Sequence, residues 1–597
     1  MSLHTRHPRR LAAGALIGVL VVALAGCSTG GSPATETDLS DVSAAKPGGT
    51  LDIVAVGDFT ALDPLNAYAV DDWGLLRATQ RQLVTYPGSA DSIAADTELV
   101  PDLAESWEVS DDRLTYTFTL KDDISFRGAT DRAITAEDFV YQVKRFPDPN
   151  KQVAAINYFN SAIVGFAEFA EGFQEIAPGD LAAAKEYQDT HDIPGVTALD
   201  DKTLQFTLTQ PAYDFLGILS MGFVSPQPEE IVSQYVGDSL EYRQNIASSG
   251  AYAVTEYLPN QKVVLEKDPE YDDESDPRHN FVDKIVVDTT ADSAATALQR
   301  IETGDADLAL NVDIPPISTI QQYVSQKSPY IFSSASGSLS SIGFNFRTPQ
   351  SPGQDAIQDI RVRQAIAYAV NKENLIQNRG GEATGTPSGQ IITSTLLGYE
   401  KFDPYATDGS RGDTEKAKEL LAEAGYPDGL TLNVAYRSNE DAEKEATTLQ
   451  EDLAAAGITL NLLPVPAADF HAFLQDEART SQWDLIANLI YAPDWQGDST
   501  RMILGGWLNS DVSPCGAGNV YGICYDNPEL NALATEAFAS EDPGPIWAEA
   551  DQLVSEDLAW VPVYERNRIV IVSEDVTYFQ WSNLATGADP TGLAVTQ

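Results

Sequence analysis

The sequence predicts an α/β fold, and two hydrophobic periodicities along the chain are the observations that predict it. Residues 114–120 alternate apolar side chains with threonine, which is the period-2 pattern of a half-buried strand. Residues 362–370 place apolar side chains at positions i, i+3, i+4, i+7 and i+8, as a helix with one buried face does. Segments of the two kinds follow one another along the chain, which is typical of α/β proteins with a largely parallel sheet.

The first half of the chain is expected to begin with short strands. A strand over 51–56 follows Gly49 and Thr50, and Pro64 stops the loop after it. The alternation of 114–120 recurs at 204–208. Two further runs rich in β-branched residues, 263–265 and 285–287, are strand candidates.

The second half is expected to alternate helices with strands. One helix begins near Asp359, and Asp413 can cap another that Gly425 and Pro427 terminate. The elements expected after it are a strand over 430–435, a helix over 443–456, a strand over 458–463 and an apolar strand over 484–491. No fixed-period repeat interrupts this order.

Length and charge exclude several classes of protein. A chain of 597 residues, 43% of them hydrophobic, suggests three or four units that each bury a core. Its formal net charge of −52 at pH 7 would repel the phosphate backbone of DNA or RNA. We therefore expect no nucleic-acid partner.

The N-terminus predicts export. Three arginines within the first ten residues precede an uncharged apolar run over 11–25, which is short for a bilayer-spanning helix and typical of a secretory signal peptide, here residues 1–26. Residues 24–27, Leu-Ala-Gly-Cys, resemble the bacterial lipobox, which implies that Cys27 carries a lipid; a plain signal peptide is the alternative. Residues 27–47, rich in small and polar residues, then form a flexible tether to the cell membrane.

Two further cysteines, Cys515 and Cys524, remain in what would be an oxidising compartment, and we predict that they form a disulfide. A zinc site would need further cysteine or histidine ligands, and the sequence has none nearby.

Catalytic patterns are absent or misplaced. Residues 26–30 match the GxSxG string of serine hydrolases, but they overlap the lipid attachment site. The histidines are scattered, and no glycine-rich phosphate loop occurs. We therefore expect neither an enzyme nor a bound cofactor or resident metal.

Several sequence blocks together carry a family resemblance. Residues 101–112 read PDLAESWEVSDD, and TAEDF follows at 135–139. The later blocks, in order, are SSGAY at 248–252, GDAD at 304–307, FNF at 344–346 and IRVRQAI at 360–366. This ordered set resembles the family 5 solute-binding proteins of ABC importers, which include the dipeptide- and oligopeptide-binding lipoproteins.

The resemblance implies a two-lobed, periplasmic-binding-protein-like (Venus flytrap) fold with an extra domain inserted into lobe I. Lobe I would comprise residues 48–84, 200–310 and 556–597, the inserted domain residues 85–199, and lobe II residues 311–555. The segments near 309–315 and 556–563 would act as hinges that let the lobes close on a ligand.

A polar loop at 492–499, directly after the apolar strand, is the expected ligand site, since α/β folds bind ligands at the ends of strands. The loop is similar to the Asp-aromatic loop of the family, which implies that Asp494 accepts the α-ammonium of a peptide. The flanking Tyr491 and Trp495 are expected to line the pocket, with Phe59 and Asn345 as further contacts. The alternatives are packing aromatics and, for Asp494, an acid that stabilises its own turn. Unlike the commoner form of the motif, the second acid, Asp498, is not followed by proline.

These observations together predict a lipid-anchored, monomeric, extracytoplasmic receptor that captures small peptides and delivers them to the subunits of an ABC permease. A non-peptide solute, such as a nickel complex, haem, an oligosaccharide or another metabolite, is the main alternative. The sequence also leaves open a secreted hydrolase and a sensing receptor without transport.

Overall fold

In a computed structural model, the described part of the chain is residues 38–597, except for 96, 152, 154, 161, 272, 313, 498, 499, 516–520, 585 and 586. The predicted signal peptide, Cys27, the first part of the tether and Asp498 lie outside the described residues. The chain divides into two units, Met1–Asp38 and Leu39–Gln597, and the second unit is described below. No helix within the described ranges combines the length and apolarity needed to cross a membrane.

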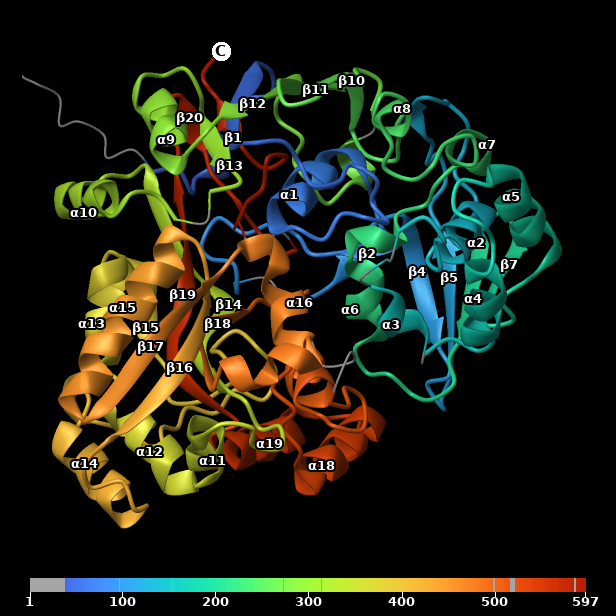
Figure 1. The fold of residues 1–597 in the computed structure, drawn as a ribbon. Helices are drawn as coiled ribbons and strands as arrows, with labels where there is room; N and C mark the ends of the chain where they lie inside the picture. The colour runs from blue at the N-terminus through green and yellow to red at the C-terminus, as the bar shows by residue number, and fades with distance from the viewer. Residues whose placement is uncertain are drawn as a thin grey trace, which may run out of the picture. The chain divides into compact units, whose positions relative to one another are not determined.

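A five-stranded sheet contains the first predicted strand (Figure 1). Its strands, in spatial order, are β10 (Tyr252–Leu258), β11 (Lys262–Lys267), β12 (Lys284–Ala291), β1 (Thr50–Val56) and β13 (Leu308–Leu310). β1 is parallel to β12 and β13, whereas the pairs β10–β11 and β11–β12 are antiparallel. Helix α9 (Ala294–Glu302) connects β12 to β13 and packs on β1. We call the part built on this sheet lobe I.

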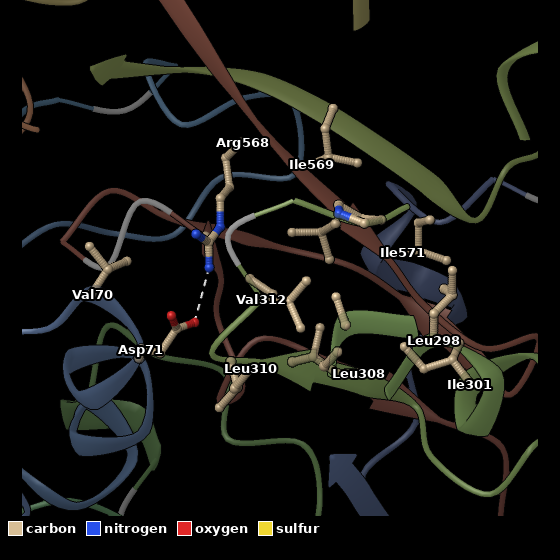
Figure 2. Close-up of a pocket in the computed structure, with 17 residues that line it drawn as sticks. Val70, Asp71, Leu298, Ile301, Leu308, Leu310, Val312, Arg568, Ile569 and Ile571 are labelled. Atoms are coloured by element: carbon tan, nitrogen blue, oxygen red, sulfur yellow. Dashed lines mark hydrogen bonds and ion pairs between the residues drawn. The ribbon is translucent and has the colours of Figure 1, made fainter. Parts of the chain in front are cut away.

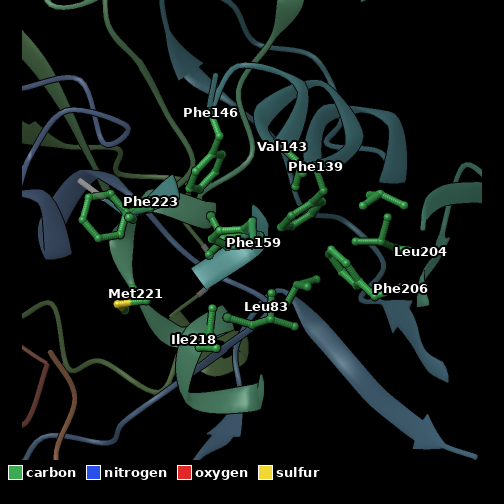
Figure 3. Close-up of a cluster of buried hydrophobic side chains, with 14 of the residues drawn as sticks. Leu83, Phe139, Val143, Phe146, Phe159, Leu204, Phe206, Ile218, Met221 and Phe223 are labelled. Carbon is green, nitrogen blue, oxygen red and sulfur yellow. The ribbon is translucent and has the colours of Figure 1, made fainter. Parts of the chain in front are cut away.

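A four-stranded antiparallel sheet has the order β4 (Ala104–Val109), β5 (Thr115–Leu120), β8 (Thr203–Thr207) and β7 (Val196–Asp200). The predicted alternation is confirmed in β5, since Tyr116, Phe118 and Leu120 are buried. Helix α2 (Ala136–Lys144) packs on β7 and β8, and Figure 3 shows the apolar core between the helices and the sheet. We call this part the four-stranded unit. Its strand β8 lies beyond residue 199, the expected end of the inserted domain.

A six-stranded sheet forms the centre of lobe II. Its order is β15 (Gly385–Pro387), β19 (Trp560–Ile571), β14 (Ile331–Phe344), β18 (Leu485–Tyr491), β16 (Leu430–Arg437) and β17 (Ile458–Val465). β19 therefore pairs within lobe II, although residues 556–597 were expected in lobe I. The domain limits given from the sequence stay a prediction.

The helices expected in lobe II are present. Asp359 caps α12 (Ile360–Ala369), and Asp413 caps α14 (Thr414–Glu423) by accepting a hydrogen bond from the backbone N–H of Lys416 at 2.9 Å. Helix α15 (Glu440–Ala455) begins three residues before the expected start and packs on β16, β17 and β18.

The expectation of a largely parallel sheet is wrong, because both large sheets are mixed. In lobe II, β16 is parallel to β17 and β18, but β14 is antiparallel to both β18 and β19, the strands on either side of it. Hydrophobic periodicity is a local property that indicates which face of a strand is buried, so it does not indicate the direction of the neighbouring strand.

The remaining elements connect these sheets. The other helices are α1 (Val70–Thr79), α3 (Ile156–Asn160), α4 (Phe166–Gln174), α5 (Leu181–Thr190), α6 (Phe215–Ser220), α7 (Glu229–Val232), α8 (Leu240–Arg243), α10 (Ile317–Gln326), α11 (Pro352–Gln358), α13 (Lys372–Arg379), α16 (Phe470–Gln475), α17 (Thr500–Met502), α18 (Pro528–Ala539) and α19 (Gly544–Glu556). The short strands are β2 (Val84–Thr85), β3 (Val100–Pro101), β6 (Arg127–Gly128), β9 (Ala247–Ser248), β20 (Val576–Tyr578), β21 (Trp581–Ser582), β22 (Gly587–Ala588) and β23 (Ala594–Val595). The predicted disulfide between Cys515 and Cys524 is confirmed.

The junction between the two large sheets lies where β13 passes the end of β19 (Figure 2). Apolar side chains from these strands and from α9 surround a small cavity of about 30 Å³, roughly the space of one water molecule. An ion pair between Arg568 of β19 and Asp71 of α1, with 3.0 Å between Nη2 and Oδ1, lies at its edge. Lobe I and lobe II are thus joined by a charged contact beside an apolar one.

Candidate ligand-binding site

The loop after β18 carries the predicted acid, Asp494. β18 is almost entirely buried, and the loop that follows it turns towards lobe I and the four-stranded unit. Asp494 is 7% exposed, and its carboxylate accepts hydrogen bonds from the hydroxyl of Tyr68, at 2.9 Å to Oδ1 and 3.0 Å to Oδ2. Its Oδ2 also accepts a hydrogen bond from the hydroxyl of Tyr158. One carboxylate of lobe II is therefore held by the loop before α1 and by helix α3.

The electrostatics of this contact follow from its burial. Burial raises the pKa of the Asp494 carboxyl to about 6, and the hydrogen bonds from Tyr158 and Tyr68 act in the opposite direction. Burial, together with the Asp494 carboxylate, raises the pKa of the Tyr158 hydroxyl well above its usual value, so this group stays a neutral donor. A carboxylate removed from water in this way is stabilised by any donor or cation that reaches it.

A cavity of about 790 Å³ lies beside the loop, within the usual size range of small-molecule sites. The four-stranded unit contributes Arg113 from the turn between β4 and β5. The N-terminus of α6 contributes Asp214 and Gly217. Lobe II contributes Trp495 from the Asp494 loop and Glu541 from the connection between α18 and α19.

Polar contacts connect the two sides of this cavity. Nη1 of Arg501 lies 2.6 Å from Oδ1 of Asp214, and Nε of Arg113 lies 3.8 Å from Oε1 of Glu541. The hydroxyl of Tyr86 donates a hydrogen bond of 3.0 Å to the carbonyl oxygen of Gln496. The structure therefore represents a state in which lobe II is closed against the rest of the molecule.

Of the five predicted contact residues, Trp495 lines the cavity and the other four do not. Asp494 precedes Trp495 in the loop and is buried against Tyr68 and Tyr158, and the remaining three lie in packed interiors. Tyr491 is 1% exposed, packs on Trp560 and donates its hydroxyl to the carbonyl of Ile391, which agrees with the alternative of a packing aromatic. It lies within β18 rather than in the loop, so its side chain follows the alternation of a strand in a buried sheet.

Phe59 and Asn345 are likewise interior residues. Phe59 is 3% exposed in the core of lobe I. Asn345 follows β14, and its amide nitrogen donates to the carbonyl oxygens of Thr480 and Trp483 at 3.1 and 3.0 Å. Its polar side chain therefore satisfies the backbone of a neighbouring turn, as buried amides commonly do.

Four residues at the site, Tyr68, Tyr158, Asp214 and Arg113, were not predicted from the sequence. These residues lie in loops, turns or a short helix without distinctive periodicity, and they lie some 280 to 430 positions from the loop that they face. An acid directly before a short apolar helix, as Asp214 is, was the one local signal available.

Two lobes of mixed α/β structure, closed around a cavity with both polar and apolar lining residues, define the class of periplasmic-binding-protein-like solute receptors. Residues 98–514 match the family described as bacterial extracellular solute-binding proteins, family 5, middle region. This match spans more than half of the sequence, and the chain belongs to that family.

Relatives with similar sequences are named for different ligands. The chain is 26% identical over 508 residues to the periplasmic oligopeptide-binding protein OppA of Escherichia coli, covering 83% of each chain. It is 25% identical over 484 residues to heme-binding protein A of Haemophilus influenzae, covering 78% of this chain and 79% of the relative. Both relatives are binding proteins by name.

Solved structures show the same fold. The clavulanic acid biosynthesis oligopeptide binding protein 2 matches with a TM-score of 0.79 and 23% identity, covering 92% of this chain and 96% of that protein. DppA from Helicobacter pylori, solved in complex with the peptide STSA, matches with a TM-score of 0.67 and 21% identity, covering 92% and 99%.

Proposed function

We propose that this protein captures small peptides in the cavity beside Asp494 and delivers them intact to an ABC permease. The observation that carries the proposal is the desolvated Asp494 carboxylate at the boundary of the lobes. A peptide ammonium that reached this carboxylate would form a charge-assisted hydrogen bond and recover part of the free energy lost on burial. The names of the oligopeptide-binding relatives support a peptide as the ligand.

Closure supplies the signal that the permease would recognise. A ligand shifts the population towards the closed state only if it binds that state more tightly than the open one. Contacts such as Arg501–Asp214 are made across the cavity and so exist only when the lobes are closed. Bound peptide adds contacts on both sides of the cavity and favours the same state.

The place of action in this proposal is the outer face of the cell membrane. The lipobox-like residues 24–27 support anchoring through a lipid on Cys27, and residues 27–47 would hold the lobes a short distance from the bilayer. The proposal includes a monomer with hinges near 309–315 and 556–563. Peptide is bound by shape and charge, and no covalent step occurs.

The test compares trialanine with N-acetyl-trialanine by calorimetry. Wild-type protein is expected to prefer the free amine. Asp494→Ala is expected to weaken trialanine by about thirtyfold or more, since the lost contact is worth at least about 2 kcal/mol, and to leave the acetylated peptide nearly unchanged. Asp452→Ala is the matched control, because burial also raises the pKa of the Asp452 carboxyl to about 6, but this residue lies on α15. Equal losses for both peptides would remove Asp494 from the amine-binding role.

Native mass spectrometry of the purified protein separates the candidate ligands. A co-purifying peptide supports the proposal, whereas haem, a nickel complex, an oligosaccharide or another metabolite contradicts it. Conversion of trialanine to alanine during prolonged incubation would instead indicate a hydrolase.

A further inference from the structure

Arg113 is the one cation among the described residues that line the cavity of about 790 Å³, and its guanidinium is loosely held. Its Nε lies 3.8 Å from Oε1 of Glu541, which is longer than a hydrogen bond. Its Cζ lies 5.7 Å from the centroid of the Tyr213 ring. The side chains of Arg113 and Glu541 are 34% and 79% exposed, and an ion pair this exposed adds little to stability. The guanidinium can therefore leave this position at small cost.

The backbone that carries this side chain is fixed by its own turn. The N–H of Arg113 donates a hydrogen bond of 2.8 Å to the carbonyl oxygen of Ser110. Oδ1 of Asp112 accepts hydrogen bonds from the hydroxyl of Ser110 at 2.6 Å and from the N–H of Leu114 at 3.1 Å. None of these bonds involves the Arg113 side chain, so the side chain can move while the turn between β4 and β5 keeps its shape.

The ring and the acid that Arg113 reaches come from opposite sides of the cavity. Tyr213 lies directly before α6 and is 46% exposed, whereas Glu541 lies in the connection between α18 and α19 of lobe II. One guanidinium lies close to both, so the space between them suits a cationic group of that size. An aromatic face and a carboxylate each attract a cation. We call Tyr213 and Glu541 the cation site.

The charges around the cavity favour a further cation. Three acids line it, Asp111, Asp214 and Glu541, against the single arginine. Asp214 is balanced by Arg501, with 2.6 Å between Oδ1 and Nη1. Asp111 and Glu541 then remain against Arg113 alone, so one cation from a ligand would bring the charges of this region into balance, and an anion would increase the imbalance.

We propose that the cation site binds the charged end of an arginine or lysine side chain in the bound peptide, and that Arg113 occupies it when the peptide has no such side chain. The inference rests on the proposed function and deepens it by naming a class of substrate, peptides with a basic side chain. Arg113 is in this proposal an internal competitor. It neutralises Glu541 when the peptide is uncharged and yields to a basic side chain when one is present.

The experiment compares arginine with citrulline, which has nearly the same shape and no charge. The probes are two tripeptides of alanine that carry arginine at the second or the third position, and their two citrulline counterparts, measured by calorimetry. Wild-type protein is expected to bind the arginine peptide about fivefold more tightly than its citrulline counterpart at one of the two positions. The ratio of the two affinities is the measured quantity, because a change in lobe closure affects both peptides equally and cancels.

Arg113→Met is the decisive variant. It keeps the length of the side chain but removes the competing cation, so the ratio of arginine to citrulline affinity is expected to rise about threefold above that of wild type. A higher preference for one charged ligand does not result from general damage to the site. A ratio that stays at the wild-type value or falls would show that Arg113 does not compete for the cation site.

Variants of the cation site itself should lower the ratio. Glu541→Gln is expected to reduce the ratio to about twofold or less. Glu451→Gln is its matched control, because Glu451 is an exposed acid on α15 that does not line the cavity, and it should keep the wild-type ratio. Tyr213→Leu removes the ring and should lower the ratio about twofold, whereas Tyr213→Phe keeps the ring face and should retain the ratio.

The control acid matters because the whole chain carries a formal net charge of −52, which attracts any cation. If Glu451→Gln lowers the ratio as much as Glu541→Gln does, or if wild-type protein binds arginine and citrulline equally at both positions, the cation site is wrong while peptide capture stands. If wild-type protein binds neither these peptides nor trialanine, both are overturned.

Discussion

The hydroxyl of Tyr68 lies 2.9 Å from Oδ1 of Asp494, although 426 positions separate the two residues along the chain. Tyr68 belongs to lobe I and Asp494 to the loop after the central strand β18 of lobe II. Tyr68 and Tyr158 both donate hydrogen bonds to the Asp494 carboxylate, and neither tyrosine belongs to lobe II. The closed arrangement therefore includes a latch made of two phenols and one acid, Tyr68, Tyr158 and Asp494.

We expect Tyr158→Phe to weaken this latch. The substitution leaves the buried Asp494 carboxylate with one donor fewer, which costs about 1–3 kcal/mol in the closed state and much less in an open state where water replaces the phenol. Small-angle scattering without ligand should therefore show a larger radius of gyration for Tyr158→Phe than for wild type. Tyr426→Phe, at a half-buried tyrosine that packs against the core of lobe II, is the control and should scatter as wild type does. Identical curves for all three proteins would contradict the latch.

Asp494 also makes stability depend on pH in a defined direction. Its folded-state pKa of about 6 lies above the ordinary value of 3.8, so the folded protein holds this proton more tightly than the unfolded chain does. The resulting stabilisation is fully present below about pH 3.8 and is lost as the pH rises through about 6. The shift corresponds to about 3 kcal/mol at most.

The measurement is urea unfolding of wild type and Asp494→Asn between about pH 4 and 7. Asparagine carries no charge, so the variant should gain stability relative to wild type as the pH rises through this window. A difference between the two proteins that stays constant with pH would show that the Asp494 carboxyl has no raised pKa.

The ion pair between Asp71 and Arg568 at the junction of the lobes should contribute a measurable coupling energy. Both side chains are about 15% exposed, so the pair is screened less than a surface pair. We expect a double-mutant cycle of Asp71→Asn and Arg568→Met, measured by urea unfolding, to give a coupling of about 1 kcal/mol that falls at high salt. Asp71 also lies in the first turn of α1, where an acid favours the helix by itself, and the cycle removes this separate effect. Simple additivity of the two substitutions would show that the pair adds nothing.

Sequence reasoning succeeded where the relevant physics is local. The alternation in β5, the cap at Asp413 and the pairing of Cys515 with Cys524 each depend on a few residues or on elimination, and each is found in the structure. Strand direction was predicted wrongly, because it depends on how the chain returns to the sheet. β14 runs antiparallel to β18, and nothing within either strand indicates it.

The candidate site shows the same limit. Asp494 and Trp495 follow a buried strand directly, so their region was predictable from the chain. Tyr158 and Asp214 reach the site only through the packing of the four-stranded unit against lobe II. Their roles depend on three-dimensional proximity, which no pattern of spacing in their own segments indicates.

Gly337 of β14 offers a test of how tightly the Asp494 loop is packed. Its φ is +76°, and a Cβ there would lie 2.8 Å from Cγ of Pro493 and 3.0 Å from Oε1 of Gln496. Gly304 has the same φ of +76°, but no described atom lies within 4 Å of its Cβ position. Gly304→Ala therefore measures the backbone cost alone, about 1 kcal/mol. Gly337→Ala should lower the free energy of unfolding by that amount and by a further amount for the clash of the new Cβ with Pro493 and Gln496, which belong to the loop of the candidate site.

We expect urea unfolding to show a loss of stability at least about 1 kcal/mol larger for Gly337→Ala than for Gly304→Ala, and calorimetry to show weaker trialanine binding for Gly337→Ala alone. Equal losses in stability with unchanged binding would mean that the loop adjusts freely and that its closed geometry is not set by contact with β14.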